Sequence, residues 1–471
     1  MKKTLLYMLL ALGSTSLAAQ YISEVVSYSP APGQFINKAP WGLPESAASI
    51  IGGVNGSLCL GAFGGEVVFR FDGPVENHPD NPFGVDFTIF GNPLPDWSEP
   101  GVVWVLKDEN GNGAPDDSWY ELAGSDYYFS STRKNYQVIY TNPGDTVARD
   151  VPWEDQMGNT GFIRANSAHV QTYYPCLDFF PGIPEGQYAV TGSMIRGAVD
   201  VDHPPLLKSA RRAFGYADNQ ARGNPPYTMP DNPYTPELEN AGGDAFDISW
   251  AVDPDGKLVE LDMIHFVKVV NAVLHEGGWL GEVSTEITGA VDIPPEPGIE
   301  GDLELVVIRD LPPEIGTTSY QMEVFAFHRG RLEYNQGVQW SCNAEWAQID
   351  AQNVLTVSGT GPLTLTASLD SDPAVKASVS TTVNSGVSSA LDGAYRSARI
   401  SMYPNPAKEE IRITGTGEAI ISFYNASGMC MKQVQPGSGN NAIRIGELPG
   451  GVYMVRIDRG SSVEWMKLLK Q

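Results

Sequence analysis

EVVFRF, residues 66–71, places Val67, Phe69 and Phe71 on one side of an extended chain, because side chains alternate between the two faces of a β-strand. Residues 85–90 (VDFTIF) and 135–140 (NYQVIY) repeat this alternation. Such period-two patterns predict strands with one buried face. The 50 Gly and 35 Pro among 471 residues supply turns between many short strands. The sequence therefore predicts an all-β protein.

Residues 20–293 contain enough of these segments for one large domain. Strands at this spacing, separated by long loops, favour a jelly-roll-like β-sandwich. The segment PPEPG follows the last of them, so we expect residues 294–300 to form a stiff Pro-rich linker. The loops of this first domain are where we expect a ligand to bind.

The first 19 residues have the features of a cleavable signal peptide. Lys2 and Lys3 precede an apolar run at residues 5–12, and small residues follow it. That run is too short to cross a bilayer, and no later stretch of the sequence is long and apolar enough to be a transmembrane segment. We therefore expect a protein that is secreted or lies at the cell surface.

The charge of the chain disfavours nucleic acid as a partner. The formal net charge is −26 at pH 7, and the acidic excess lies before residue 392. A strongly acidic body repels the phosphate backbone of a nucleic acid and anionic membrane surfaces. The same charge is compatible with cation binding or with plain solubility.

LKDENGNGAPDDSWY, residues 106–120, carries oxygen-bearing side chains at alternating positions around two glycines. Ca²⁺ prefers six to eight oxygen ligands, and an alternating D-x-N-x-N-G run lets one short loop surround the ion. The sequence therefore predicts a Ca²⁺ site, although a metal-free Asn-Gly hairpin between two strands is the alternative. The proposed ligands are Asp108, Asn110, Asn112, Asp116 and Asp117.

Four other loops combine an aromatic residue with acids or amides: NPLPDWSE at 92–99, VPWED at 151–155, FGYADNQ at 214–220 and GGWLGEVSTE at 277–286. Aromatic faces beside polar groups suit a glycan or another ring-bearing small molecule. For each aromatic residue, the alternative is that it anchors a loop to the core. The candidate ligand-binding residues are Trp97, Trp153, Tyr216, Asp218 and Trp279.

The sequence contains no signature that predicts catalysis. It lacks G-x-S-x-G, H-E-x-x-H and a Walker A motif, so we do not expect an enzyme. A carboxylate pair for glycan hydrolysis stays open, because such a pair needs only proximity in space. The four cysteines are widely spaced and do not form a zinc pattern. A disulfide between Cys59 and Cys176 is an alternative to free buried thiols.

The first domain resembles a family of Bacteroidota surface proteins called "cell surface protein". The resemblance rests on SEPGVVWVLKDENGNGAPDDSWYELAGSDY, GYADN, FDISWAVDPDGK and GWLGEVSTEITG, in that order. It implies a surface location, and it makes a corrinoid a candidate ligand because some members are associated with corrinoid and other TonB-dependent uptake systems.

Residues 301–384 are similar to bacterial Ig-like group 2 modules, on the segment that begins VQWSCNAEWAQID. This resemblance implies a small Ig-like β-sandwich that acts as a spacer. Residues 385–397 are small and polar, and we expect them to form a flexible linker.

Residues 398–471 resemble the type A C-terminal sorting domain of the type IX secretion system, on MYPNPA, ISFYNASG, LPGGVYMVRI and a basic end. The resemblance implies a second small β-sandwich, recognition by the type IX secretion machinery, removal of the tail and attachment of the cargo to surface lipopolysaccharide. The motif residues are Tyr403, Pro404, Asn405, Pro406, Gly451, Tyr453, Lys467 and Lys470.

Together these features predict an exported, calcium-stabilised surface protein that binds a glycan or another nutrient ligand. A secreted glycan hydrolase and a structural or adhesive surface protein are the two alternatives.

Overall fold

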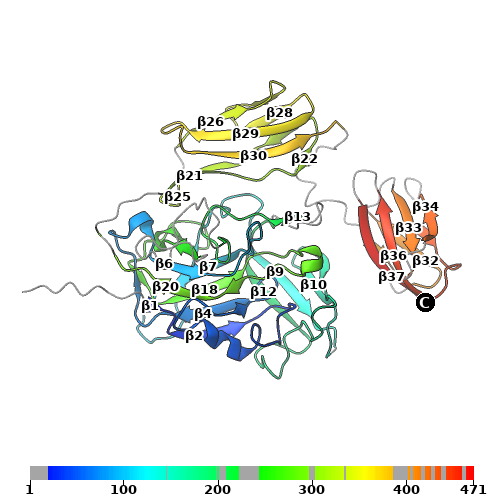
Figure 1. The fold of residues 1–471 in the computed structure, drawn as a ribbon, viewed down its shortest axis with the longest axis horizontal. Helices are drawn as coiled ribbons and strands as arrows, with labels where there is room; N and C mark the ends of the chain where they lie inside the picture. Colours follow the sequence, from blue (N-terminus) through cyan, green and yellow to red (C-terminus); the bar gives the residue numbers. More distant parts are fainter. Residues whose placement is uncertain are drawn as a thin grey trace, which may run out of the picture. The chain divides into compact units, whose positions relative to one another are not determined.

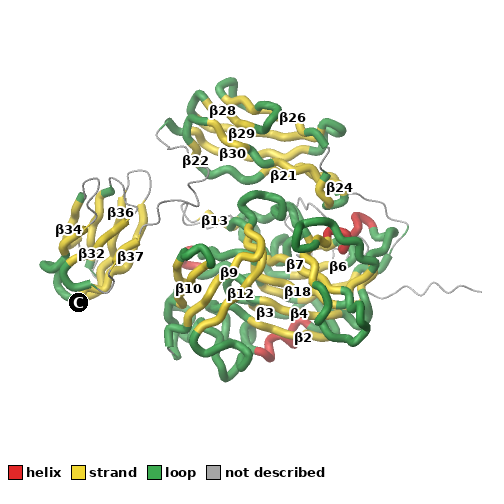
Figure 2. The backbone as a smooth tube through the Cα atoms, turned by 180° about the vertical axis from the view of Figure 1, so that it is seen from behind, coloured by secondary structure: helices red, strands yellow, loops and turns green. Residues whose placement is uncertain are grey.

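A computed structural model describes residues 20–471 except 145, 198, 201–207, 222–242, 296, 298–302, 334–335, 386–400, 404–406, 415–418, 426–429, 436–441 and 459–462. Strands dominate this part of the chain (Figures 1 and 2). Four short 3-10 helices accompany them in the described residues: η1 (Pro44–Ile50), η2 (Pro82–Gly84), η3 (Ile248–Trp250) and η4 (Gly278–Leu280). The predicted all-β class is confirmed. The predicted signal peptide lies outside the described residues.

The chain divides into two compact units. The first contains Met1–Arg309, Val324–Val338 and Leu369–Lys376, and the second contains Asp310–Glu323, Gln339–Ser368 and Ala377–Gln471.

A six-stranded antiparallel sheet forms the centre of the first unit. Its members, in spatial order, are β16 (Ala251–Val252), β8 (Trp119–Leu122), β7 (Gly101–Leu106), β18 (Phe266–Asn271), β4 (Glu66–Arg70) and β2 (Glu24–Ser29). Val67 and Phe69 of β4 point into the main core, as their alternation predicts. Figure 1 shows β2, β4, β18 and β7 side by side.

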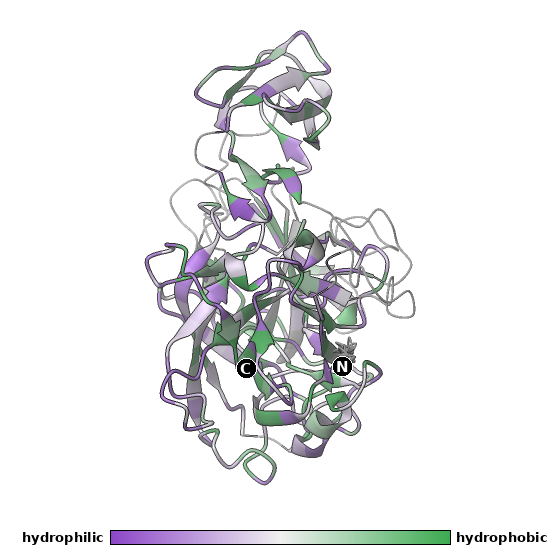
Figure 3. Ribbon diagram, turned by 90° about the vertical axis from the view of Figure 1, so that its left-hand side faces the viewer, coloured by the Kyte–Doolittle hydropathy of each residue, from purple (hydrophilic) through white to green (hydrophobic). Residues whose placement is uncertain are grey.

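A four-stranded sheet covers the inner face of this sheet and completes a sandwich. Its order is β1 (Gln20–Tyr21), β20 (Gly289–Asp292), β6 (Phe87–Phe90) and β15 (Gly243–Phe246). Phe87 and Ile89 of β6 share one buried cluster with Val103 and Val105 of β7. Burying each such side chain contributes about 1.5–3 kcal/mol, so this apolar layer holds the two sheets together. Figure 3 shows hydrophobic residues, in green, concentrated on strands in the body of this unit.

A third sheet, of order β11 (Thr160–Ile163), β10 (Val151–Asp155), β9 (Arg133–Thr141) and β12 (Gln187–Met194), has a separate core. Tyr136, Val138 and Tyr140 of β9 pack in this core. Residues 151–155, which we expected to form a loop, are strand β10. They form a strand because Val151 packs into the core and Asp155 accepts a hydrogen bond from the Tyr136 hydroxyl at 2.5 Å.

The first unit extends beyond residue 293, where we placed the end of the first domain. A sheet of β21 (Glu304–Ile308), β24 (Val324–His328) and β25 (Arg331–Leu332) belongs to it. The reason is apolar burial, because Leu303, Val307 and Phe327 belong to the main core cluster. Trp250 adds a hydrogen bond from Nε1 to the Arg329 carbonyl at 2.8 Å.

The remaining strands of the predicted Ig-like region form two sheets. One has the order β22 (Glu314–Ile315), β30 (Lys376–Val383), β29 (Gly361–Leu369) and β26 (Val338–Cys342). The other contains β23 (Ser319–Gln321), β28 (Val354–Val357) and β27 (Ala347–Ile349). Leu355, Leu363 and Leu365 are buried, as alternating strands of a small sandwich require.

The C-terminal strands also form two sheets around one core. One sheet contains β31 (Ser401–Tyr403), β32 (Glu410–Thr414) and β35 (Ala442–Arg444). The other has the order β34 (Cys430–Val434), β33 (Ile420–Tyr424), β36 (Gly451–Asp458) and β37 (Val463–Lys470). Ile411, Phe423 and Leu468 are fully buried between them.

Candidate functional site

Three polar or aromatic side chains form a row on the outer face of the six-stranded sheet. Glu121 of β8 is paired with Trp104 of β7, and Trp104 is paired with Lys268 of β18. Directly opposed residues of antiparallel strands project to the same face. Their neighbours Val103, Val105, Val267 and Val269 point to the main core instead, so the row lies on the outer face.

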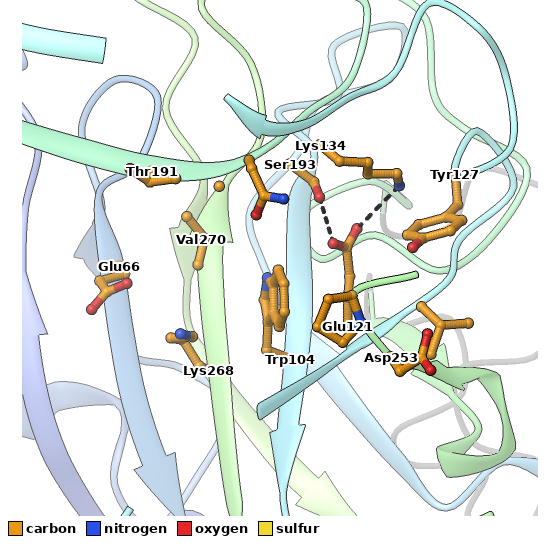
Figure 4. A pocket seen from close by; sticks show the side chains of 14 residues that line it. Glu66, Trp104, Glu121, Tyr127, Lys134, Thr191, Ser193, Asp253, Lys268 and Val270 are labelled. Atoms are coloured by element: carbon orange, nitrogen blue, oxygen red, sulfur yellow. Dashed lines mark hydrogen bonds and ion pairs between the residues drawn. The ribbon is translucent and has the colours of Figure 1, made fainter. Parts of the chain in front are cut away.

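A cavity of about 220 Å³ lies over this row (Figure 4). The sheet supplies one side of it, and β9, β12 and the turn after β16 supply further lining residues. Its lining includes two aromatic rings and two opposite pairs of charges, from Trp104, Tyr127, Glu121, Lys134, Glu66 and Lys268. All of these residues belong to the first unit.

Glu121 is the buried acid of the pocket, with 5 % of the residue exposed. The Ser193 hydroxyl donates a hydrogen bond to its Oε2 at 2.5 Å, and Lys134 Nζ lies 3.9 Å from its Oε1. Burial raises the pKa of Glu121, while the charge of Lys134 and the hydrogen bond from Ser193 oppose the rise. The carboxyl is therefore fixed in position and retains a proton more readily than an exposed glutamate does.

Lys134 extends from β9 to the same place. Its side chain is 31 % exposed, but its Nζ atom is shielded and has no hydrogen-bond partner among the described atoms. The Nζ atom lies 2.8 Å from the centroid of the Tyr127 ring. Desolvation lowers the pKa of Lys134 to about 8, with the charge of Glu121 acting in the opposite direction. Figure 4 shows Lys134, Ser193 and Tyr127 around the carboxyl of Glu121.

Lys268 and Glu66 form the second pair of charges. The Nζ atom of Lys268 lies 5.4 Å from the centroid of the Trp104 ring and 4.6 Å from that of Trp119, within the range of cation–π attraction. Desolvation lowers the pKa of Lys268 and raises the pKa of Glu66, and each charge opposes the shift of the other. The pocket thus offers donors, acceptors and aromatic surface with its charges nearly balanced.

The aromatic residues that we expected to bind a ligand do not line this pocket. Trp97 and Tyr216 are 9 % and 2 % exposed and pack together in an apolar cluster with Val102 and Val283. Tyr216 also accepts a hydrogen bond from the Asp126 amide at 3.2 Å. Both therefore anchor loops to the core, and the prediction that they present stacking faces is wrong.

The other predicted ligand-binding residues are separated from one another. Trp153 is half-buried on β10, where its indole covers Gly161. The side chain of Trp279 lies outside the part that the structure describes. Asp218 is fully buried, and its carboxylate accepts hydrogen bonds from the amides of Asn92 at 2.9 Å and Glu286 at 2.8 Å. Asp218 therefore holds loops together.

Asp218 belongs to a cluster of acids with Glu99 and Glu286. One carboxylate oxygen from each lies within 4.8 Å of the others, so among the described His, Cys, Asp and Glu side chains these three are close enough to hold a metal ion together. Burial raises the pKa of all three, that of Glu99 to about 7. The cluster is distinct from the loop where we predicted Ca²⁺.

In that loop, the side-chain oxygens accept hydrogen bonds from backbone amides and side-chain amides of the loop itself. Asp108 accepts hydrogen bonds from the amides of Gly111 at 2.7 Å, Asn112 at 3.2 Å and Gly113 at 2.8 Å. Asp117 accepts one from the Glu109 amide at 3.0 Å, and Asp116 accepts two from the Asn112 side chain. The side-chain amide of Asn110 also donates to Asp116 at 3.1 Å. These contacts keep the five predicted oxygen donors in one compact loop, and the Ca²⁺ site stays a prediction.

The cysteines that the structure describes as free are Cys59, Cys176 and Cys342, so the alternative disulfide between Cys59 and Cys176 is not formed. Cys59 is buried, with its Sγ 2.9 Å from the Ser284 hydroxyl.

The sequence did not identify as site residues Trp104, Glu121, Lys134, Ser193 and Lys268. One signal was present: Lys268 interrupts the apolar run FVKVV. A lysine in such a run indicates a position on the face away from the core, whereas Trp104 in GVVWVL is apolar and gives no such signal. The sequence could not show that Lys134 of a distant strand meets that face.

The C-terminal tail is the part of the chain that matches a known family. Residues 401–471 match the family described as the secretion system C-terminal sorting domain. These residues are a sorting domain. The protein is therefore exported to the cell surface or the extracellular space by the type IX secretion machinery. Among the described residues, no helix is long and apolar enough to cross a membrane.

The structure describes the sorting motifs in part. Tyr453 is buried, and its hydroxyl donates to the Pro449 carbonyl at 2.9 Å. Lys470 is buried beside the C-terminus, and Gly451 begins β36. Residues 404–406 and the side chains of Tyr403 and Lys467 lie outside the described part.

Other comparisons give only remote similarity. No curated protein matches the chain. A Drosophila OTK extracellular fragment is 12 % identical, with 46 % of this chain and 83 % of that one covered and a TM-score of 0.19. The Escherichia coli adhesin FdeC is 10 % identical, with coverages of 44 % and 77 % and a TM-score of 0.15. Latent PorU from Porphyromonas gingivalis is 11 % identical, with coverages of 71 % and 29 % and a TM-score of 0.15. These values carry no functional argument.

Proposed function

We propose that this exported protein is a surface carbohydrate-binding protein whose first unit holds one sugar ring in the pocket over Trp104. The cavity of about 220 Å³ is the observation that carries this proposal. An apolar cavity of about 150 Å³ can hold benzene, so this volume suits one six-membered ring with substituents. A corrinoid, with its four linked rings and side chains, is far larger than this cavity.

The polarity of the pocket favours a neutral, hydroxyl-rich ring. Lys134 offers unpaired N–H groups, Glu121 offers carboxyl oxygens, and Trp104 offers aromatic surface. A sugar hydroxyl both donates and accepts hydrogen bonds, so it can bridge the two charges of a pair. Opposite charges within the pocket give an anionic ligand no clear advantage over a neutral one.

The glycan hydrolase is the weaker alternative at this pocket. Its two glutamates stand on β8 and β4, which are separated by β7 and β18. Strands lie about 4.8 Å apart, so three steps separate these positions by about 14 Å. Glycosidase carboxyl pairs lie about 5–9.5 Å apart. The two glutamates are therefore too far apart for this role, and a hydrolase would have to pair Glu121 with Asp253, the third acid of the lining. We favour binding without hydrolysis.

The sorting domain would direct this unit to the surface, and the Ig-like region would present it there. Attachment to lipopolysaccharide belongs to this proposal, because it is what the resemblance of the tail to type A sorting domains implies. A purely adhesive protein would use an exposed surface and would leave the pocket without a ligand.

Calorimetric titration of the mature chain with methyl glycosides tests the proposal. These sugars keep the ring but have no free aldehyde. We expect one or more to bind, and Trp104→Ala to weaken binding at least tenfold, which corresponds to about 1.4 kcal/mol. Phe162→Ala is a matched control, because Phe162 is a 48 % exposed aromatic residue on β11. Equal affinities for both variants, or no binding by any glycoside, would contradict the proposal.

A further inference from the structure

Lys134 presents its amine to the pocket in a setting that disfavours the charged form. The Nζ atom is shielded and has no hydrogen-bond acceptor among the atoms described. A protonated amine has three N–H donors, and a buried donor without an acceptor costs about 1–3 kcal/mol. The carboxyl of Glu121, 3.9 Å away, is beyond hydrogen-bonding distance and is already bound by Ser193.

We propose that Lys134 is a reactive amine that forms a reversible imine with the aldehyde or ketone group of a small molecule in the pocket. This inference rests on the proposed function and deepens it, because the open-chain form of a reducing sugar carries such a carbonyl group. The bound ligand would then be held by one covalent bond in addition to its polar contacts.

The groups around Lys134 can supply each proton that the reaction needs. The neutral Nζ attacks the carbonyl carbon, a C–N bond forms, the C=O electron pair moves to oxygen, and one N–H proton passes to that oxygen to give a neutral carbinolamine. The C–O bond then breaks while the Glu121 carboxyl protonates the hydroxyl, which leaves as water, and the nitrogen returns its remaining proton to the Glu121 carboxylate. One amine and one carbonyl thus give one imine and one water, with no change of oxidation state.

The position of Glu121 fits the role of proton donor. Ser193 fixes the carboxyl at 2.5 Å, and its Oε1 lies 3.9 Å from the attacking nitrogen. Burial raises the pKa of this carboxyl, so it is protonated more often than an exposed glutamate at neutral pH.

The lowered pKa of Lys134 also raises the share of its amine in the neutral, nucleophilic form. Desolvation lowers its pKa to about 8. At pH 7.5 about a quarter of such amines are neutral, against about a thousandth for an ordinary lysine with a pKa of about 10.4. Glu121, Asp253 and the Tyr127 ring line the pocket around it. The negative charge of Glu121 limits the shift, and the face of the Tyr127 ring, 2.8 Å from Nζ, also attracts the charged form. Only the neutral amine is a nucleophile.

Reductive trapping tests the inference on the full mature chain. Glycolaldehyde is added at pH 7.5 with cyanoborohydride, which converts an imine into a stable secondary amine, and peptide mapping by mass spectrometry gives the labelling rate at each lysine. We expect Lys134 to be labelled at least tenfold faster than Lys257, whose side chain is 76 % exposed. In urea the two rates should become equal, because unfolding removes the pocket. Slower or equal labelling of Lys134 in the native protein would overturn the inference.

Variants separate reactivity from folding. Lys134→Arg keeps the charge and should lose the label, Glu121→Gln should slow labelling of Lys134 at least fivefold, and Lys257→Arg should leave it unchanged. Circular dichroism checks that each variant folds. If a variant does not fold, the native and urea rates of the unmodified chain decide the matter.

This experiment also distinguishes the two proposals. Binding of methyl glycosides without trapping at Lys134 would refute the imine and leave the carbohydrate proposal standing. Trapping at Lys134 without binding of any glycoside would support the reactive amine and refute the carbohydrate proposal.

Discussion

Glu282 shows what a single buried acid does to stability. Only 2 % of the residue is exposed; its Oε1 accepts a hydrogen bond from the Gln34 amide at 2.7 Å, and its Oε2 has no partner among the described atoms. Burial raises its pKa from 4.5 to about 8. Between these values the folded protein keeps a proton that the unfolded chain releases. The contribution to stability is therefore full below about pH 4.5 and is lost as pH rises to about 8.

We expect the free energy of unfolding to fall between about pH 4.5 and pH 8, and Glu282→Gln to reduce this fall by about 1.4 kcal/mol or more, the equivalent of one pKa unit. Glutamine has almost the same shape and cannot ionise. Urea unfolding at several pH values measures the effect, with Glu185→Gln, at an exposed position, as the control. A pH profile of Glu282→Gln that is identical to that of the unmodified protein would show that Glu282 ionises normally.

At the scale of elements, the loop between β7 and β8 is either a Ca²⁺ site or a metal-free Asn-Gly hairpin, and its stability can distinguish the two. Asp108 accepts hydrogen bonds from three backbone amides of the loop, so Asp108→Ala should lower the unfolding midpoint with or without metal. Only the part of the stability that depends on Ca²⁺ tests the predicted site.

We expect Ca²⁺ to raise the unfolding midpoint relative to chelator, by a stabilisation of about 2.7 kcal/mol at 100-fold saturation. Mg²⁺ should raise the midpoint much less than Ca²⁺ does, because it requires a tighter octahedron of ligands and loses its bound waters reluctantly. Thermal unfolding in chelator, Ca²⁺ and Mg²⁺ gives the three midpoints. Asp108→Ala should remove most of the increment, whereas Asp255→Asn, in an exposed turn of similar composition, should keep it. The same midpoint in all three conditions would leave the loop a metal-free hairpin.

Strands with regular alternation could be predicted from the sequence, and the pocket could not. Residues 66–71 and 135–140 correspond to β4 and β9, because burial of one face produces the period-two pattern. The sequence of residues 151–155 did not predict strand β10, because an acid at Asp155 is not expected to be buried. Its burial depends on the hydrogen bond from the Tyr136 hydroxyl of β9, which the sequence does not show. The site depends on such long-range contacts throughout, since Glu121, Lys134 and Ser193 come from three different strands. Trp97 and Tyr216 were predicted to bind a ligand because acids and amides flank them in the sequence. In the structure, both residues pack in an apolar cluster and anchor their loops to the core.

At the scale of the whole molecule, the chain combines a unit that contains the pocket with a separate sorting domain. The pocket residues lie in the first compact unit, whereas residues 401–471 have a buried core of their own. The two functions should therefore be separable by mutation: a pocket variant should reach the surface, and a chain without its sorting domain should fold and bind.

The sorting domain gives the last prediction. Deletion of residues 398–471 removes strands β31 to β37 and leaves the core of the first unit complete. We expect the shortened protein to accumulate in the periplasm, because the type IX machinery no longer recognises it. Cell fractionation and surface protease digestion measure its location, and glycoside binding by the periplasmic protein shows that it has folded. Trp104→Ala in the full-length chain is the matched control, which should appear at the surface in normal amount and bind weakly. If the shortened chain reached the surface as efficiently as the full-length chain, an export signal would have to lie elsewhere in the molecule.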